Sequence, residues 1–306
     1  MPLSEFELIQ RYFSSYGRGA AVDLAVGDDC AILSLASNER LATSIDTLVG
    51  GVHFFEDSFP EDIGFRAVSV AASDLAAMGA KPIGMTLAMT VPEVDELWLH
   101  AFAQGMAAAS TCYRLPLVGG DTTKGPCSIT IQVMGALPTD KALLRQGAQA
   151  GDRLCVSGLL GDAAGGLAIL QGKWQAQPEH AEYLLQRFHR PEARLDLGYT
   201  LLGSATAAID ISDGLLADAG HLAAASGVRV CIDSQRLPLS EALQSHADPE
   251  QVRQWALTGG DDYELCFSLP VSVPIPAGCS CIGSIEEGNG LLCDSHTVTE
   301  TGYAHF

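Results

Sequence analysis

The stretch that decides the fold reads Ile209-Asp210-Ile211-Ser212-Asp213-Gly214 and leads directly into residues with helical spacing. An apolar run, an aspartate-bearing loop and a helix in succession are typical of an α/β protein. The free N–H groups at the start of such a helix form an anion site, and Ser212 or Asp213 is expected to cap it. The apolar stripe of this helix, predicted over 215–226 and ended by Gly227, consists of Leu215, Leu216, Ala219, Leu222 and Ala223.

The same alternation of apolar runs, glycines and helical stripes extends along the whole chain. Helical spacing predicts two further helices, Ile63–Gly79 and one that contains Trp98 to Cys112. The fold class is therefore expected to be mixed α/β, of the α+β type. Strands are predicted at Cys30–Leu35, Leu41–Leu48, Ile83–Val91, Ser128–Leu137, Arg153–Ser157, Val228–Asp233, Tyr263–Leu269 and Cys281–Ile285.

The length of the chain, 306 residues, allows two domains of ordinary size. Pro138, Gly147 and Gly151 bracket a polar stretch between two units of strand and helix. We therefore expect an N-terminal domain over residues 1–138 and a C-terminal domain over 139–306.

Charge and cysteine usage restrict the partners and the compartment. The net charge of −20 would repel a nucleic-acid backbone or an anionic membrane, so neither is an expected partner. Cysteines inside apolar runs, such as Cys30, Cys155, Cys231 and Cys266, behave as small hydrophobic residues of a reducing compartment. No apolar run approaches the roughly 20 residues of a membrane span. These features predict a cytoplasmic protein.

Aspartates at the ends of apolar runs are the main chemical signal in this sequence. Several carboxylates brought together repel one another unless cations lie between them, and hard oxygen ligands favour Mg²⁺ or Ca²⁺. Enzymes that gather Mg²⁺ in this way most often act on the phosphates of a nucleotide. The aspartate-bearing segments are Gly27-Asp28-Asp29, Ser44-Ile45-Asp46, Ser73-Asp74, Gly119-Gly120-Asp121, Asp210-Ile211-Ser212-Asp213 and Gly259-Gly260-Asp261-Asp262.

Each of these residues also has a purely structural interpretation. Taken singly, Asp46 is better explained as a cap or turn residue, and Gly-Gly-Asp as an ordinary turn. Asp74 lies inside a predicted helix, where aspartate is an indifferent helix former, so either a metal compensates it or it lies at the surface. His53 fits a polar loop as well as a ligand contact. The number of such aspartates, rather than any one of them, favours a metal site.

Seven segments in order along the whole chain resemble the thiamine-monophosphate kinase family. This family belongs to the superfamily of aminoimidazole ribonucleotide synthetase and selenophosphate synthetase. The Asp46–His53 segment, Tyr263-Glu264-Leu265 and the terminal segment favour it over these relatives. The matching segments are Gly27-Asp28-Asp29-Cys30-Ala31, Asp46-Thr47-Leu48-Val49 with His53-Phe54, Ser73–Ala80, Gly119–Thr123, Asp210–Leu215, Gly259–Leu265 and Gly302–Phe306.

The resemblance implies transfer of the γ-phosphoryl group of ATP to thiamine monophosphate, assisted by several Mg²⁺ ions, by direct in-line transfer. It also implies a homodimer joined through the N-terminal sheets and leaves a monovalent cation open. By the family pattern, Asp121 and Arg145 act in catalysis, Gly120, Asp121, Arg145 and Ser212 bind the nucleotide, His53, Asp261 and Tyr303 bind the substrate, and Asp29, Ser44, Ile45, Asp46, Asp74, Asp121, Asp210 and Asp213 bind metal.

The chain departs from the family pattern at three positions, because the family usually has glutamate at Asp261, aspartate at Ala304 and often threonine at Ile45. The first departure shortens a substrate contact. Other functions stay open at this point: another ATP-dependent enzyme of the superfamily, a metal-dependent phosphohydrolase, or a cation-binding protein without catalysis.

Overall fold

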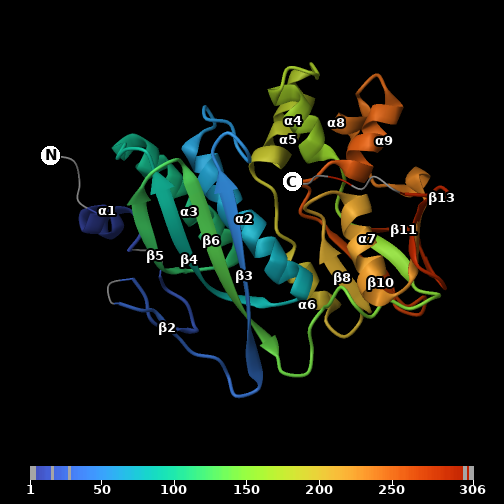
Figure 1. Ribbon diagram of the computed structural model, residues 1–306, viewed down its shortest axis with the longest axis horizontal. Helices are drawn as coiled ribbons and strands as arrows, with labels where there is room; N and C mark the ends of the chain where they lie inside the picture. Colours follow the sequence, from blue (N-terminus) through green and yellow to red (C-terminus); the bar gives the residue numbers. More distant parts are fainter. Residues whose placement is uncertain (1–4, 15–16, 27–28, 299–301, 303–306) are drawn as a thin grey trace. The chain divides into compact units, whose positions relative to one another are not determined.

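A four-stranded sheet with helices on one face forms the first of two units in the computed structural model, which describes residues 5–14, 17–26, 29–298 and 302 (Figure 1). The first unit comprises Met1–Leu75 and Ala80–Asp140, and the second comprises Ala76–Gly79 and Lys141–Phe306. The elements of the first unit, with the end of α2 in the second, are α1 (Glu5–Tyr12), β1 (Val22–Leu24), β2 (Ile32–Leu33), β3 (Glu39–Val49), α2 (Pro60–Met78), β4 (Lys81–Val91), α3 (Glu96–Tyr113), β5 (Leu117–Lys124) and β6 (Ser128–Pro138).

The strands of this sheet have the order β3-β6-β4-β5, so β3 and β5 are its two edges. β6 is antiparallel to both β3 and β4, whereas β4 and β5 are parallel. Side chains on the face covered by α2 and α3 are buried, as the alternation predicted. The opposite face carries hydrogen-bonded threonines, such as Thr47 with Thr130 at 2.9 Å and Thr90 with Thr123 at 3.1 Å.

Helices α2 and α3 pack closely because glycines face the neighbouring backbone. A Cβ atom on Gly105 would lie 1.8 Å from the carbonyl oxygen of Glu61, and one on Gly64 would lie 2.3 Å from that of Phe102. Any larger side chain at either position would force the helices apart. Asp95 caps α3 by accepting hydrogen bonds from the N–H groups of its first turn.

The second unit contains a seven-stranded sheet in the order β13-β12-β9-β11-β7-β10-β8. All neighbouring strands are antiparallel except β12 and β9. Its strands are β7 (Arg153–Ser157), β8 (Ala207–Asp210), β9 (Arg229–Ile232), β10 (Leu265–Leu269), β11 (Cys279–Glu286), β12 (Gly290–Cys293) and β13 (His296–Thr297), and its helices are α4 (Asp162–Leu170), α5 (Pro178–His189), α6 (Leu195–Leu201), α7 (Leu215–Ser226), η1 (Ser234–Arg236), α8 (Glu241–Gln244) and α9 (Pro249–Thr258).

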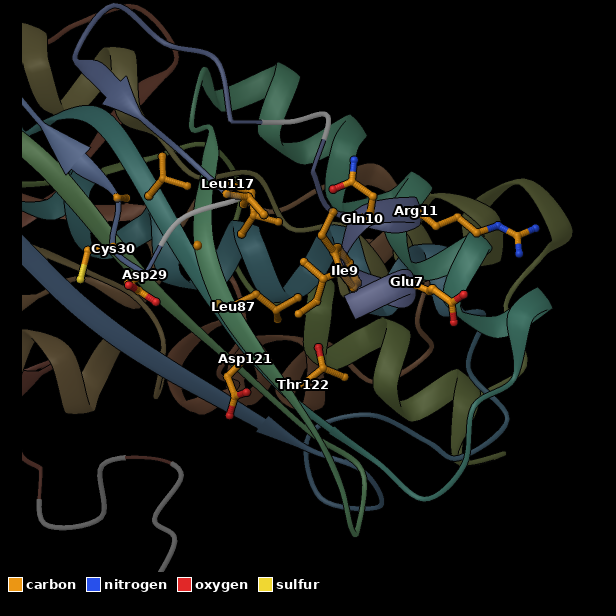
Figure 2. Close-up of a pocket in the computed structure, with 16 residues that line it drawn as sticks. Glu7, Ile9, Gln10, Arg11, Asp29, Cys30, Leu87, Leu117, Asp121 and Thr122 are labelled. Carbon is orange, nitrogen blue, oxygen red and sulfur yellow. The ribbon is translucent and has the colours of Figure 1, made fainter. Parts of the chain in front are cut away.

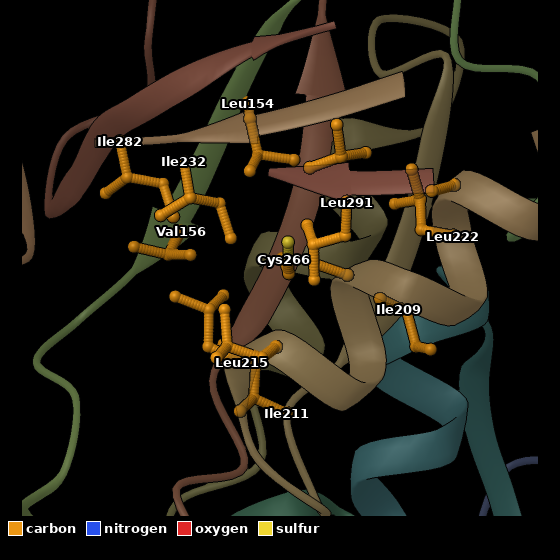
Figure 3. Close-up of a cluster of buried hydrophobic side chains, with 14 of the residues drawn as sticks. Leu154, Val156, Ile209, Ile211, Leu215, Leu222, Ile232, Cys266, Ile282 and Leu291 are labelled. Carbon is orange, nitrogen blue, oxygen red and sulfur yellow. The ribbon is translucent and has the colours of Figure 1, made fainter. Parts of the chain in front are cut away.

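The core of this unit lies between α7 and one face of the sheet (Figure 3). Leu215 and Leu222 of α7 are fully buried in the same cluster as Val156, Ile209 and Cys266 from three neighbouring strands. Because α7 starts directly after β8 and packs back on the sheet, the loop between them is held at the end of β8.

The mixed α/β class is confirmed, and α7 has the bounds that its apolar stripe predicted. Two local predictions were wrong. Only Ile32–Leu33 of the predicted Cys30–Leu35 strand is extended, and Cys30 is exposed. Gly119-Gly120-Asp121 is not a turn after a strand, because β5 continues through it to Lys124. No helix in the described part of the chain is long and apolar enough to cross a membrane.

Candidate active site

Four predicted metal ligands of the first unit come from β3 and α2. Ser44 and Asp46 are two positions apart on β3, so their side chains share the face that α2 covers. The hydroxyl of Ser44 donates a hydrogen bond of 2.5 Å to Oδ2 of Asp74. This contact explains the tolerance of an aspartate inside α2. Ile45 points the other way and is 62% exposed, so only its backbone could reach a metal on the covered face.

His53 lies in the turn that follows β3. Its Nδ1 accepts a hydrogen bond of 3.0 Å from the backbone N–H of Val49. Because Nδ1 is the acceptor, the proton of the neutral imidazole is on Nε2. The turn therefore holds the ring with an N–H group suited to an anionic oxygen.

A cavity of about 920 Å³ beside β5 is lined by Asp29, Gly120 and Asp121 (Figure 2). Gly120 faces β4 so closely that a Cβ atom there would lie 2.1 Å from the carbonyl oxygen of Leu87. The glycine is thus required by strand packing as well as by any ligand. Asp29 and Asp121 both have exposed side chains at this cavity.

The two groups of ligands in the first unit do not meet within one chain. Asp46 is on edge strand β3 and Asp121 on edge strand β5, which are three strand spacings, or roughly 14 Å, apart. The strand register also places them on opposite faces, since Asp46 is level with Ile131 and Leu87 whereas Asp121 is level with Ala88. Among the described residues, no three His, Cys, Asp or Glu side chains form a group able to hold a metal.

Two loops of the second unit pair with each other at the ends of β8 and β10. The N–H of Asp261 donates to the carbonyl of Ser212 at 2.9 Å, and the N–H of Tyr263 donates to that of Ile211 at 2.8 Å. In return, the N–H of Ile211 donates to the carbonyl of Glu264 at 2.8 Å. The predicted metal and nucleotide residues 210–213 and the predicted substrate residue Asp261 therefore lie in adjacent backbone segments.

The prediction that Ser212 or Asp213 caps α7 was wrong. The N-cap residue is Gly214, which has no side chain to accept a hydrogen bond from the first turn of the helix. Instead, Oδ2 of Asp218, in the first turn of the helix, accepts hydrogen bonds from the N–H groups of Ser212 at 3.0 Å and Asp213 at 3.1 Å. A side chain inside the helix thus orders the loop that precedes it, and these N–H groups are already satisfied.

Electrostatics at this loop favour a cation. Burial raises the pKa of Asp218 to about 7, and the negative charges of Asp210 and Asp213 add to the effect. Asp210 is itself only 5% exposed. Oxygen donors crowded in this way are the donor set that Mg²⁺ prefers.

The Asp261–Glu264 segment has two sides. Asp261 and Tyr263 have φ angles of 68° and 52°, in the left-handed region where residues other than glycine carry roughly 1–2 kcal/mol of strain each. Asp262 and Glu264 point inward and are 1% and 0% exposed. Asp261, and not its neighbour Asp262, is therefore the carboxylate available to a ligand.

Arg145 is exposed and lies at the far end of α7 from Ser212. Its carbonyl accepts a hydrogen bond of 2.9 Å from Ser226, the last residue of that helix. The twelve residues of α7 span roughly 18 Å, so the structure does not bring the backbone of Arg145 to the Ser212 loop. The predicted substrate residue Tyr303 and the variant position Ala304 lie outside the described residues.

Sequence reasoning missed two sets of residues around this site. Asp218 was overlooked because an acidic residue in the first turn of a helix is common. The buried partners of Glu264 were missed because Arg187 and Arg194 are distant in sequence. The signal that could have revealed them is a pair of acidic residues, Asp262 and Glu264, at the start of an apolar strand.

Comparison with known proteins gives a consistent set of relatives. The family model described as AIR synthase related protein, N-terminal domain, matches residues 27–137. The thiamine-monophosphate kinase of Escherichia coli (strain K12) is 44% identical over 326 aligned residues, which cover 100% of this chain and 99% of the relative.

Solved structures agree with this similarity. Thiamine-monophosphate kinase from Stenotrophomonas maltophilia K279a matches with a TM-score of 0.87 at 41% identity, covering 97% of this chain and 99% of that one. The structure of AaThiL complexed with AMPPCP and TMP matches with a TM-score of 0.83 at 35% identity, covering 89% of each chain.

Proposed function

The chain belongs to the thiamine-monophosphate kinase family, and we propose that it transfers the γ-phosphoryl group of ATP to thiamine monophosphate. An oxygen of the acceptor phosphate attacks the γ-phosphorus in line, and the bond to the β,γ-bridging oxygen breaks. The bridging oxygen keeps the electron pair and leaves as ADP, and the product is thiamine diphosphate. The observation that carries this proposal is the similarity of the full chain to the thiamine-monophosphate kinase of Escherichia coli. The similar structure of AaThiL, which was solved in complex with AMPPCP and TMP, supports it.

Several Mg²⁺ ions fit the oxygen donors of this chain and would neutralise phosphate charge when bound. We assign them to Asp29, Ser44, Ile45 through its carbonyl, Asp46, Asp74, Asp121, Asp210 and Asp213. The hydrogen bond between Ser44 and Asp74 supports this assignment, because it shows two of these oxygens in direct contact.

Arg145, Gly120, Asp121 and Ser212 are proposed to bind the nucleotide. Because Arg145 and Ser212 lie at opposite ends of α7, we expect them to contact different parts of ATP. This reaction does not require a strong general base, since the acceptor phosphate is already an anion and needs placement more than deprotonation.

His53, Asp261 and Tyr303 are proposed to bind thiamine monophosphate. The Nε2–H of His53 suits its phosphate, and the carboxylate of Asp261 suits its cationic ring system.

A homodimer joined through the N-terminal unit is the expected assembly. Two observations support it: one face of the four-stranded sheet is covered by no helix among the described residues of its own unit, and Ile45 is 62% exposed on that face. A third observation is that Asp46 and Asp121 lie on opposite edges of the sheet, so that a metal site containing both needs two copies of the chain. We infer that the β5 edge of one copy lies beside the β3 edge of the other, so that each metal site takes ligands from both.

Mixing two inactive variants tests this assembly. Asp46→Asn and Asp121→Asn should each abolish turnover and stay folded, since volume changes little. If ligands come from both copies, an equal mixture after subunit exchange should regain about one quarter of wild-type activity, because half the dimers contain one intact site of two. A mixture that stays inactive despite proven exchange would place each site within a single chain. Full activity in either variant alone would remove that residue from the metal assignment.

The main rival is a metal-dependent phosphohydrolase, in which water is the acceptor. Release of ADP that depends strictly on thiamine monophosphate separates the two reactions. Equal ADP release with and without it would favour the hydrolase.

A further inference from the structure

The loop that carries Asp261 is held in place from its buried side. Oδ2 of Asp262 accepts a hydrogen bond of 2.8 Å from the N–H of Gly161. The fully buried carboxylate of Glu264 accepts hydrogen bonds from Arg187 at 3.0 Å, from Nε of Arg194 at 2.7 Å and from the hydroxyl of Ser157 at 2.5 Å. These contacts fix the two residues that alternate with Asp261 and Tyr263.

The backbone on the ligand side is also fixed. The N–H groups of Asp261 and Tyr263 are bonded to the Ser212 and Ile211 carbonyls, and both residues keep left-handed φ angles. Gly260 approaches the loop that contains Ser212 so closely that a Cβ atom on Gly260 would lie 2.4 Å from the carbonyl oxygen of Ser212. With the backbone held, the orientation of the Asp261 carboxylate depends on its side-chain torsions.

The hydroxyl of Tyr263 restricts those torsions. It donates a hydrogen bond of 3.1 Å to Oδ1 of Asp261, two residues before it. Tyr263 is only 9% exposed, so its ring is held by packing and the hydroxyl has a defined position. The buried Tyr263 hydroxyl therefore orients the Asp261 carboxylate before any ligand binds.

We propose that Tyr263 is a positioning residue that aims the Asp261 carboxylate at a cationic heterocycle or its amino group. The inference rests on the proposed function, in which Asp261 contacts thiamine monophosphate. It assigns substrate selectivity to a residue that does not itself need to touch the substrate. The Asp261 carboxylate is one methylene shorter than the glutamate usual in the family, so its reach depends more strongly on orientation.

Tyr263→Phe tests this role because it removes the hydroxyl and keeps the ring. We expect the KM for thiamine monophosphate to rise about 5–10-fold, as for loss of one hydrogen bond of ordinary strength, while the KM for ATP and kcat stay within about twofold. Tyr183→Phe is the matched control, since the Tyr183 hydroxyl also donates to an aspartate, Asp162, at 2.9 Å in the same unit. It should leave the KM for thiamine monophosphate unchanged.

A double-mutant cycle with Asp261→Ala separates positioning from a general structural effect. Asp261→Ala alone should raise the KM for thiamine monophosphate at least about tenfold, and adding Tyr263→Phe should change it no further. If Tyr263→Phe alone has no effect while Asp261→Ala does, the positioning role is overturned and the proposed function stands. If Asp261→Ala also has no effect, both the positioning role and the Asp261 contact are overturned. Product formation, measured separately, still reports on the reaction itself.

Discussion

Replacing Glu264 by glutamine should destabilise the second unit by about 3 kcal/mol, because it breaks a buried ion pair from one side. Glu264 is 0% exposed, and the side chains of Arg187 and Arg194 are only 15% and 24% exposed. The amide keeps one oxygen but loses the charge, and its NH₂ group faces arginine donors. Breaking a buried pair from one side costs about 3–5 kcal/mol. We take the lower end, because glutamine preserves the volume and because Arg194 and Arg187 keep ion pairs with Glu192 at 2.9 Å and Asp162 at 4.0 Å.

Urea unfolding followed by tryptophan fluorescence measures this loss. Trp174 and Trp255 lie 5.5 Å apart, between ring centroids, in the second unit, whereas Trp98 is in the first. In a Trp98→Phe background the signal therefore reports on the second unit alone. With a urea slope of roughly 2 kcal/mol per molar, the midpoint should fall by about 1.5 M.

Glu250→Gln is the matched control for this experiment. Glu250 pairs with Arg253 at the surface of the same unit, with its side chain 77% exposed. Exposed pairs of this kind contribute about 0–1 kcal/mol, so the midpoint should barely move. Equal small losses in both variants would refute the reasoning that Glu264 holds the loop through its charge.

Two further changes test other parts of the structure. Burial raises the pKa of Asp262 well above its ordinary value of 3.8. The contribution of this shift to the free energy of unfolding is fully present below pH 3.8 and is lost as the pH rises, because the unfolded chain releases the proton first. Asp262→Asn should therefore gain stability relative to wild type between pH 5 and pH 8 in urea unfolding, and parallel pH profiles would contradict this. Asp95→Ala removes the cap of α3, whose Oδ1 accepts from the N–H groups of Leu97 and Trp98, and should cost about 1 kcal/mol in unfolding of the first unit. A loss of the same size in Asp95→Asn would show that the cap is not the cause.

Local pattern in the sequence was enough to locate most elements. The stripe over 215–226 gave α7, and alternation gave β6 nearly to the residue. These succeed because burial on one face repeats with the period of the element itself. The alternative interpretation of Gly119-Gly120-Asp121 as an ordinary turn failed, because Gly120 instead permits close packing of β5 on β4.

The arrangement of the site depends on contacts that no local pattern contains. Strand order decides that Asp46 and Asp121 lie on opposite edges, and strand order is set by long-range pairing. Similarly, the sequence does not distinguish the roles of Asp261 and Asp262. Only the structure shows that the Asp262 side chain points inward and accepts a hydrogen bond from the N–H of Gly161. The sequence therefore indicates which residues belong to the candidate site, whereas their arrangement within each unit comes only from the structure.

The most direct test of the central claim is to incubate the purified protein with ATP, Mg²⁺ and thiamine monophosphate and to separate the products by chromatography. We predict that thiamine diphosphate and ADP appear in equal amounts and that neither forms when thiamine monophosphate is left out. Formation of ADP and inorganic phosphate without thiamine diphosphate, or no turnover at all, would contradict the proposed reaction.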